Sequence, residues 1–441
     1  MISNKTKFEN LIKFFIYFFP FSFIIGNSAV NINVFLVILI SGIYFFIFKK
    51  NLKLNKIIIT IFIFSFYLSC LTVFKILSSP SYNSNEIFKA IIHLRYPLFS
   101  FFLYNIFLYI NFDIKKILYI YSLAVIILVF DLPFQYIFGF NIIGIEAKEN
   151  YFNSFFFDEK VAGGFILSFQ FFLIAGLIYF FKDRKFSEIY QALIISLSLV
   201  AIFLSQNKMS LLLSILGLVI FCLLYRKNLR SIILSFFIFI SFLLIFPENK
   251  IKENYGEMIN NIKSFKLKST LFTKYLNEVP LEELKKEWPK SHKTKNQYYH
   301  GIGSGHAQIF STSLVIIKEN SIFGTGLKGY MSACKKSEKK LWCSTHPHNY
   351  YLDIAIISGL PGILFVFIII FLVVRKFLNL RIFKKKNFYL NELFYLALIV
   401  NFVIIFFPIK SSGSFFTTNN LSYIIFTVTL ISIFQEKLKK S

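Results

Sequence analysis

Long apolar stretches recur along the whole chain and alternate with short polar connections. Many run for 18 residues or more without a charged side chain, and an α-helix needs about 20 such residues to cross a bilayer. The chain does not show the short alternating segments of a transmembrane barrel. The pattern therefore predicts an all-α integral membrane protein with about twelve transmembrane helices. They are expected near residues 11–27, 30–48, 57–77, 90–111, 117–138, 161–181, 189–205, 209–225, 231–246, 349–374, 390–408 and 421–435.

Composition and charge agree with a membrane protein. Hydrophobic residues make up 56% of the 441 residues and charged residues 16%, whereas soluble domains have about 45–50% and about 25%. These values exclude a soluble enzyme and a disordered chain. The net charge is +26, which in a soluble protein would suggest nucleic-acid binding. Cationic loops on the cytoplasmic side explain it here, so no nucleic-acid partner is expected.

The cationic side chains also predict the orientation of the helices, because they gather on alternate connections. They are Lys49, Lys50, Lys53 and Lys56; Lys115 and Lys116; Lys182, Arg184 and Lys185; Arg226, Lys227 and Arg230; and residues 375–386. All fall on one side when both termini are cytoplasmic.

The opposite side is expected to hold one large loop over residues 247–348, between the ninth and tenth helices. One membrane domain would then comprise helices one to nine (1–246), this loop, and helices ten to twelve (349–441). The loop is predicted to contain short helices near 280–288 and 306–319, the second followed by the glycine-rich turn 323–326.

Candidate chemistry concentrates on the external side. All six histidines fall there by this topology, and histidine is the side chain whose usual pKa is nearest neutrality. They are His93, His292, His300, His306, His346 and His348. Cations gather on the same face, at Lys89, Arg95, Lys160, Lys208 and Lys410. Such a rim suits a pyrophosphate or another phosphorylated substrate, although lysines there could also contact lipid headgroups.

Two of the four cysteines, Cys334 and Cys343, lie close together in the external loop. In an oxidising compartment such a pair predicts a disulfide, which would close a short segment just before His346. The pair His346 and His348 could also begin a metal site. We expect no metal, because a third ligand at a suitable spacing is not evident.

Several motifs, in the same order, resemble the O-antigen ligase and polymerase family, whose members handle polyprenyl-linked glycans on the periplasmic side of the bacterial inner membrane. The most specific part is the glycine-rich turn followed by His-Pro-His-Asn-x-Tyr-Leu. The matching stretches are 95–98, Asp131 and Gln135 with Gly139, Asn141 and Gly144, then 157–159, 205–208, 304–306, 322–326, 343–352 and 412–416.

The resemblance implies a metal- and cofactor-independent, inverting glycosyl transfer. The donor would be a glycan on polyprenyl pyrophosphate and the acceptor a hydroxyl of lipid A-core, with membrane lipid around both. We expect His348 to act as the base, with His346 as the second candidate. The expected substrate-binding residues are Arg95, Lys208, His306, Asn349 and Lys328. Family members often have arginine in place of Lys208 and His306, and lysine lacks its fork of donors.

Two other functions compete with a ligase. A polymerase would extend the lipid-linked glycan by the same chemistry, but the single long loop favours the ligase. A transporter or flippase of lipid-linked sugars would be expected to place ionisable residues near the bilayer midplane and to show repeated halves. Here the ionisable candidates lie at the outer rim, and no repeat is visible.

Overall fold

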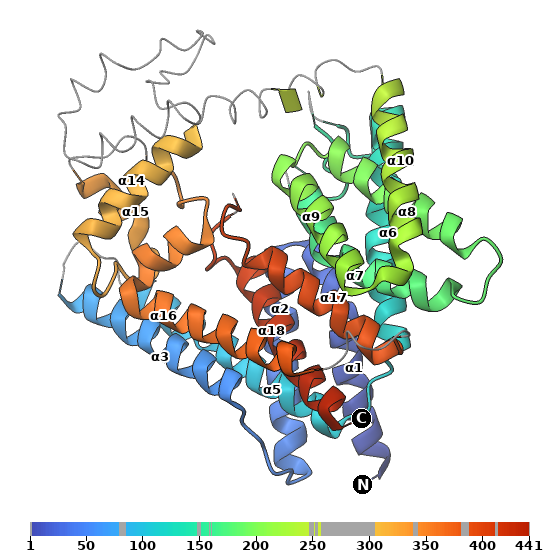
Figure 1. The fold of residues 1–441 in the computed structure, drawn as a ribbon. Coiled ribbons are helices and arrows are strands. Elements are labelled where there is room, and N and C mark those ends of the chain that lie inside the picture. The colour runs from blue at the N-terminus through green and yellow to red at the C-terminus, as the bar shows by residue number, and fades with distance from the viewer. Residues whose placement is uncertain are drawn as a thin grey trace, which may run out of the picture.

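Figure 1 shows the fold in a computed structural model of the chain. The structure describes residues 2–78, 85–147, 151–157, 159, 161–246, 251, 255–256, 305–337, 343–380, 388–410 and 413–440. For residues 2–4, 85–86, 305–307 and 440 it describes the backbone alone. The described part is helical apart from turns, loops and an isolated bridge between Phe140 and Glu146.

The helices follow the predicted order along the chain. They are α1 (Ile2–Ile25), α2 (Asn27–Ile47), α3 (Lys56–Leu77), α4 (Asn85–His93), α5 (Arg95–Tyr109), α6 (Ile114–Phe138), α7 (Ala162–Phe181), α8 (Ser187–Leu204), α9 (Lys208–Leu224), a 3₁₀ turn at Arg226–Asn228, α10 (Leu229–Ile245), α14 (Gly305–Glu319), α15 (Gly329–Lys336), α16 (Tyr350–Asn379), α17 (Leu390–Ile405) and α18 (Thr418–Lys440).

Ten helical stretches of the described residues are long and apolar enough to cross a membrane, and α9 and α17 are shorter apolar helices. These twelve coincide with the twelve predicted segments. The prediction of an all-α membrane protein is therefore confirmed, while the number of crossings and their sidedness stay predictions. The predicted helix near 306–319 is present as α14, and the one near 280–288 lies outside the described residues.

The first helix begins and the last ends at the same end of the bundle, and α14 and α15 lie at the other end (Figure 1). We call this other end, which also carries the starts of α7, α9, α16 and α18, the far end. The helices α7 and α18 are the most enclosed of the candidate spans. Their aromatic side chains pack together in the core, for example Phe169 against Tyr423.

The predicted helix over 90–111 is wrong in one respect, because Leu94 divides it into α4 and α5. The cause is Pro97, which has no N–H to donate to the carbonyl of His93 and whose ring would clash with that carbonyl. Proline is tolerated in the first turn of a helix, so a new helix starts at Arg95. The break places His93 and Arg95 on either side of a bend.

The helix after residue 349 is interrupted near its start. Gly359 has φ +62°, a left-handed conformation inside α16, and Pro361 has no N–H to offer the carbonyl of Ile357. The turn after α14 supplies the missing donors: Thr325 N donates to Ile356 O at 2.7 Å and Gly326 N to Ile357 O at 2.9 Å. The glycine-rich motif thus completes a broken helix.

Candidate functional site

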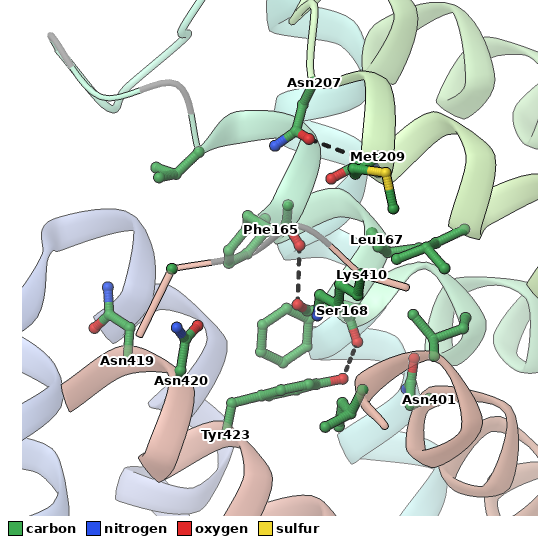
Figure 2. Close-up of a pocket in the computed structure, with 18 of the residues that line it drawn as sticks. Phe165, Leu167, Ser168, Asn207, Met209, Asn401, Lys410, Asn419, Asn420 and Tyr423 are labelled. Carbon is green, nitrogen blue, oxygen red and sulfur yellow. Dashed lines mark hydrogen bonds between the residues drawn. The ribbon is translucent and has the colours of Figure 1, made fainter. Parts of the chain in front are cut away.

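A cavity of about 260 Å³ lies among the far ends of α7, α9, α17 and α18 (Figure 2). Its apolar lining comes mainly from phenylalanine and isoleucine side chains. Its polar lining is mostly neutral, with amides and hydroxyls outnumbering charges. The polar side chains are Ser168, Asn207, Ser210, Tyr350, Asn401, Lys410, Asn419, Asn420 and Tyr423.

One wall is formed by the Ser-Gln-Asn-Lys motif where α9 begins. Asn207 caps this helix, since its side chain accepts a hydrogen bond from Ser210 N at 3.2 Å. The motif rests directly on Gly163 of α7, where a Cβ would clash with Ser205 Oγ. Close packing of these helices is what brings Asn207 to the cavity. Lys208 is the next residue but does not line it.

Among the residues that the structure describes, Lys410, in the loop after α17, is the cation that lines the cavity. Its Nζ lies 5.0 Å from the centre of the Tyr350 ring, a cation–π contact. Burial disfavours the charged ammonium and lowers the pKa of Lys410 to about 8. The side chain is therefore mostly charged at neutral pH and would gain from an anionic ligand.

His346 and His348 stand side by side, with ring centres 4.0 Å apart. His348 Nε2 lies 3.3 Å from Ser344 Oγ, and His346 Nδ1 lies 2.9 Å from Thr345 Oγ1. Two charged imidazolium rings at this separation would repel each other, which favours at least one neutral ring. His348 has φ +57°, a conformation that is uncommon outside glycine and that clusters near functional sites.

Asn349 holds this turn against the cavity. Its Oδ1 accepts from Tyr351 N at 2.9 Å and caps α16, while its Nδ2 donates to Pro408 O at 2.8 Å and Lys410 O at 3.2 Å. Both ends of the amide are engaged within the protein. Asn349 thus ties the histidine turn to the loop that carries Lys410, and its contact with substrate stays a prediction.

Asp353, one turn into α16, fixes the next part of the same loop. The residue is 1% exposed, and its Oδ2 accepts from Ser414 Oγ at 2.6 Å and from Phe415 N at 2.8 Å. Ser414 O accepts in turn from Asn420 Nδ2 at 2.7 Å. The Ser-Gly-Ser-Phe-Phe motif is thus held by a buried carboxylate beside the cavity.

Arg95 lies at the start of α5 and reaches the first turn of α18. Its guanidinium donates to Tyr96 Oη at 2.7 Å and to Thr418 Oγ1 at 3.4 Å. Its Nε is buried without a hydrogen-bond partner. Thr418 directly precedes Asn419 and Asn420, which line the cavity. Arg95 therefore binds the residue of α18 that comes just before the cavity lining.

The other predicted site residues are more scattered. Lys328 is exposed at the start of α15, and its charge acts on Asp353. The side chain of His306 lies outside the described residues. His93 is buried, with its ring 5.4 Å from that of Tyr96, so it belongs to the core.

Cys334 and Cys343 are joined by a disulfide, as predicted. It links α15 to the residues immediately before the His-Pro-His turn. The bridge packs in a small apolar cluster with Ile316 and Ile356, and so fastens the turn to α14 and α16. No group of three metal-binding side chains occurs among the residues that the structure describes.

The Asp131 and Gln135 motif has a structural role. Asp131 is fully buried, and its carboxylate accepts from Ile142 N at 2.8 Å and from Ser154 Oγ. Gln135 Oε1 accepts from Ser154 N at 2.9 Å, and Asn141 Oδ1 accepts from Ile145 N at 2.7 Å. These bonds fold the connection between α6 and α7.

Lys410 and the motif 205–208 that contains Asn207 are among the residues that the sequence singles out, whereas no motif includes the asparagines at 401, 419 and 420. A polar amide inside an apolar stretch was the available signal for Asn401. The other two follow the Ser-Gly-Ser-Phe-Phe motif by a few residues.

Comparison with known proteins bears on this arrangement. Residues 193–367 match the model of the family described as O-antigen ligase, a region that runs from α8 through the histidine turn and past Gly359. The sequence matches none of the curated proteins. The matched region contains the most specific motifs, and over these residues the chain is similar to the O-antigen ligase and polymerase family.

Proposed function

We propose that this protein is an O-antigen ligase that acts at the periplasmic face of the inner membrane. It moves a glycan from polyprenyl pyrophosphate to a hydroxyl of lipid A-core. The family match supports a ligase- or polymerase-type enzyme with lipid-linked glycan substrates. The donor, the acceptor and the inverting, metal-independent chemistry are the proposal.

The observation that carries the proposal is the junction between the histidine turn and the cavity. Tyr350, two residues after His348, lines the cavity together with Lys410, and Asn349 binds the backbone of Lys410. A proton acceptor and a cation that suits a leaving pyrophosphate therefore belong to one hydrogen-bonded unit.

In the proposed reaction His348 takes the proton of the acceptor hydroxyl. The hydroxyl oxygen forms a bond to the anomeric carbon while the bond from that carbon to the pyrophosphate oxygen breaks. The lipid pyrophosphate leaves with the electron pair, and attack from the opposite side inverts the anomeric centre. Lys410, Arg95 and Lys208 stabilise the departing charge. A positioned base contributes roughly 10²–10⁴-fold, and fixed charges at a developing anion contribute comparable amounts.

The direct test is transfer by purified protein that is given lipid-linked glycan and lipid A-core. His348→Ala should fold and bind donor but lose transfer by roughly 10²–10⁴-fold, and His346→Ala tests the second candidate base. Arg226→Ala changes a cation at the opposite end of the bundle and should transfer normally. Wild-type transfer by His348→Ala would exclude it as the base, and activity lost with EDTA and restored by a divalent cation would exclude a metal-independent reaction.

Lipopolysaccharide from a deletion strain separates ligase from polymerase. Loss of all capped core is expected for a ligase. Core that carries a single repeat would show that the chain is a polymerase instead.

A further inference from the structure

The floor of the cavity contains a buried amide that the protein leaves unsatisfied. Asn401 lies on α17, four residues before its end, and is 1% exposed. Neither its Oδ1 nor its Nδ2 has a hydrogen-bond partner, although the residue lines the cavity. Leaving such a group unpaired lowers the stability of the folded protein. A ligand that bonds to the amide would recover that stability.

A second asparagine with an unpartnered atom lies across the cavity. Asn419 Oδ1 is buried without a partner, and Figure 2 shows Asn419 and Asn420 on one side with Asn401 on the other. Tyr423 lies on the floor and donates its hydroxyl to Ser168 O. Unpartnered atoms of two asparagines thus belong to the lining of one cavity.

The hydrogen-bonding chemistry of these amides limits the classes of ligand that would fit the cavity. An amide offers both donors and acceptors, and so do the hydroxyl and acetamido groups of a sugar. A pyrophosphate accepts hydrogen bonds and suits cations, whereas an isoprenoid chain satisfies neither end of the amide. The cavity, at about 260 Å³, lies just below the usual ~300–1,000 Å³ of small-molecule sites. It suits one sugar ring better than an extended glycan.

Lys410 and Asn401 come from different parts of the chain near the end of α17. Lys410 belongs to the loop beyond α17, whereas Asn401 lies inside α17, about 6 Å before the end of this helix at the usual rise per residue. A sugar phosphate could therefore contact Lys410 with its anionic end while its ring enters toward Asn401.

We infer that Asn401 determines specificity for the sugar of the lipid-linked donor, by hydrogen-bonding a hydroxyl or acetamido group at the cavity floor. The inference rests on the proposed function. Lys410 binds the phosphate part of the same ligand. Loss of the Asn401 amide then removes recognition of the sugar but leaves recognition of the lipid pyrophosphate.

Two probes test this division: a short-chain polyprenyl pyrophosphate that carries one N-acetylhexosamine, and the same lipid pyrophosphate without sugar. Binding is measured calorimetrically on the full-length protein in nanodiscs. Wild type should bind the sugar-bearing probe at least tenfold more tightly. Asn401→Leu should abolish that preference, and its unfolding temperature should be unchanged or higher, because leucine removes an unpaired buried amide.

Two further variants complete the design. Asn33→Leu is the matched control, since Asn33 is a buried asparagine of α2 whose Nδ2 donates to Phe15 O at 3.1 Å; it should keep the preference. Lys410→Met should weaken the binding of both probes by a similar factor.

The inference is overturned if Asn401→Leu still binds the sugar-bearing probe preferentially, or if this substitution lowers the affinity for both probes equally. Wild-type protein that binds neither probe would overturn the proposed function together with the inference. Binding with the expected preference but without glycosyl transfer would contradict the proposed function alone.

Discussion

Binding of a pyrophosphate beside Lys410 should draw a proton into the protein. Burial lowers the pKa of this lysine to about 8, so a bound anion that stabilises the ammonium should raise that pKa again. The change to test is Lys410→Arg, which keeps the positive charge but does not titrate in this range. Proton uptake therefore reports on the titrating ammonium.

The size of the effect follows from the pKa. At pH 8 about half of the molecules carry neutral Lys410, and at pH 7 about one tenth. If the bound pyrophosphate keeps the lysine charged, binding takes up about 0.5 proton per site at pH 8 and about 0.1 at pH 7. The sign follows from the lowered pKa: affinity is highest below pH 8 and falls as the pH rises through 8.

Calorimetry in buffers of different ionisation enthalpy measures this uptake directly. The probe is the sugar-free polyprenyl pyrophosphate, whose phosphates are already largely ionised at pH 8. Uptake near half a proton in the wild type and near zero in Lys410→Arg is expected. Equal uptake in the two proteins would refute the reasoning, because another group would then be the one that titrates.

Three further predictions concern the fold. Both thiols of Cys334 and Cys343 should resist alkylation until reduced, and loss of the bridge should lower the free energy of unfolding by roughly 2–3 kcal/mol; ready labelling of the native protein would contradict this. Gly359→Ala should lower the unfolding temperature strongly, because its Cβ would clash with a backbone carbonyl of the turn after α14 at a positive φ; a variant as stable as wild type would show that the break in α16 is not needed. Topology reporters fused after Arg226 and after Lys293 should report opposite sides of the membrane, and a shared side would exclude the proposed topology.

Much of the candidate site could be anticipated from local motifs. The histidine turn and Arg95 were visible as clusters of titratable and cationic residues, and Lys410 was visible as a cation beyond a helix. Their relation was not, because it depends on Asn349 bonding to a loop that lies about 60 residues further along the chain. The same limit applies to Asn401, because only the tertiary structure shows that its amide lines the cavity.

What the sequence by itself determined is the set of apolar helices and their order along the chain. Apolar length and cationic flanks act locally, so their effects can be inferred without packing. The tertiary structure alone decided which polar residues serve the fold and which face the cavity. Asp131 and Asn349 are engaged in hydrogen bonds within the protein, whereas Asn401 has none, because satisfaction of a buried polar group depends on neighbours that are distant in sequence.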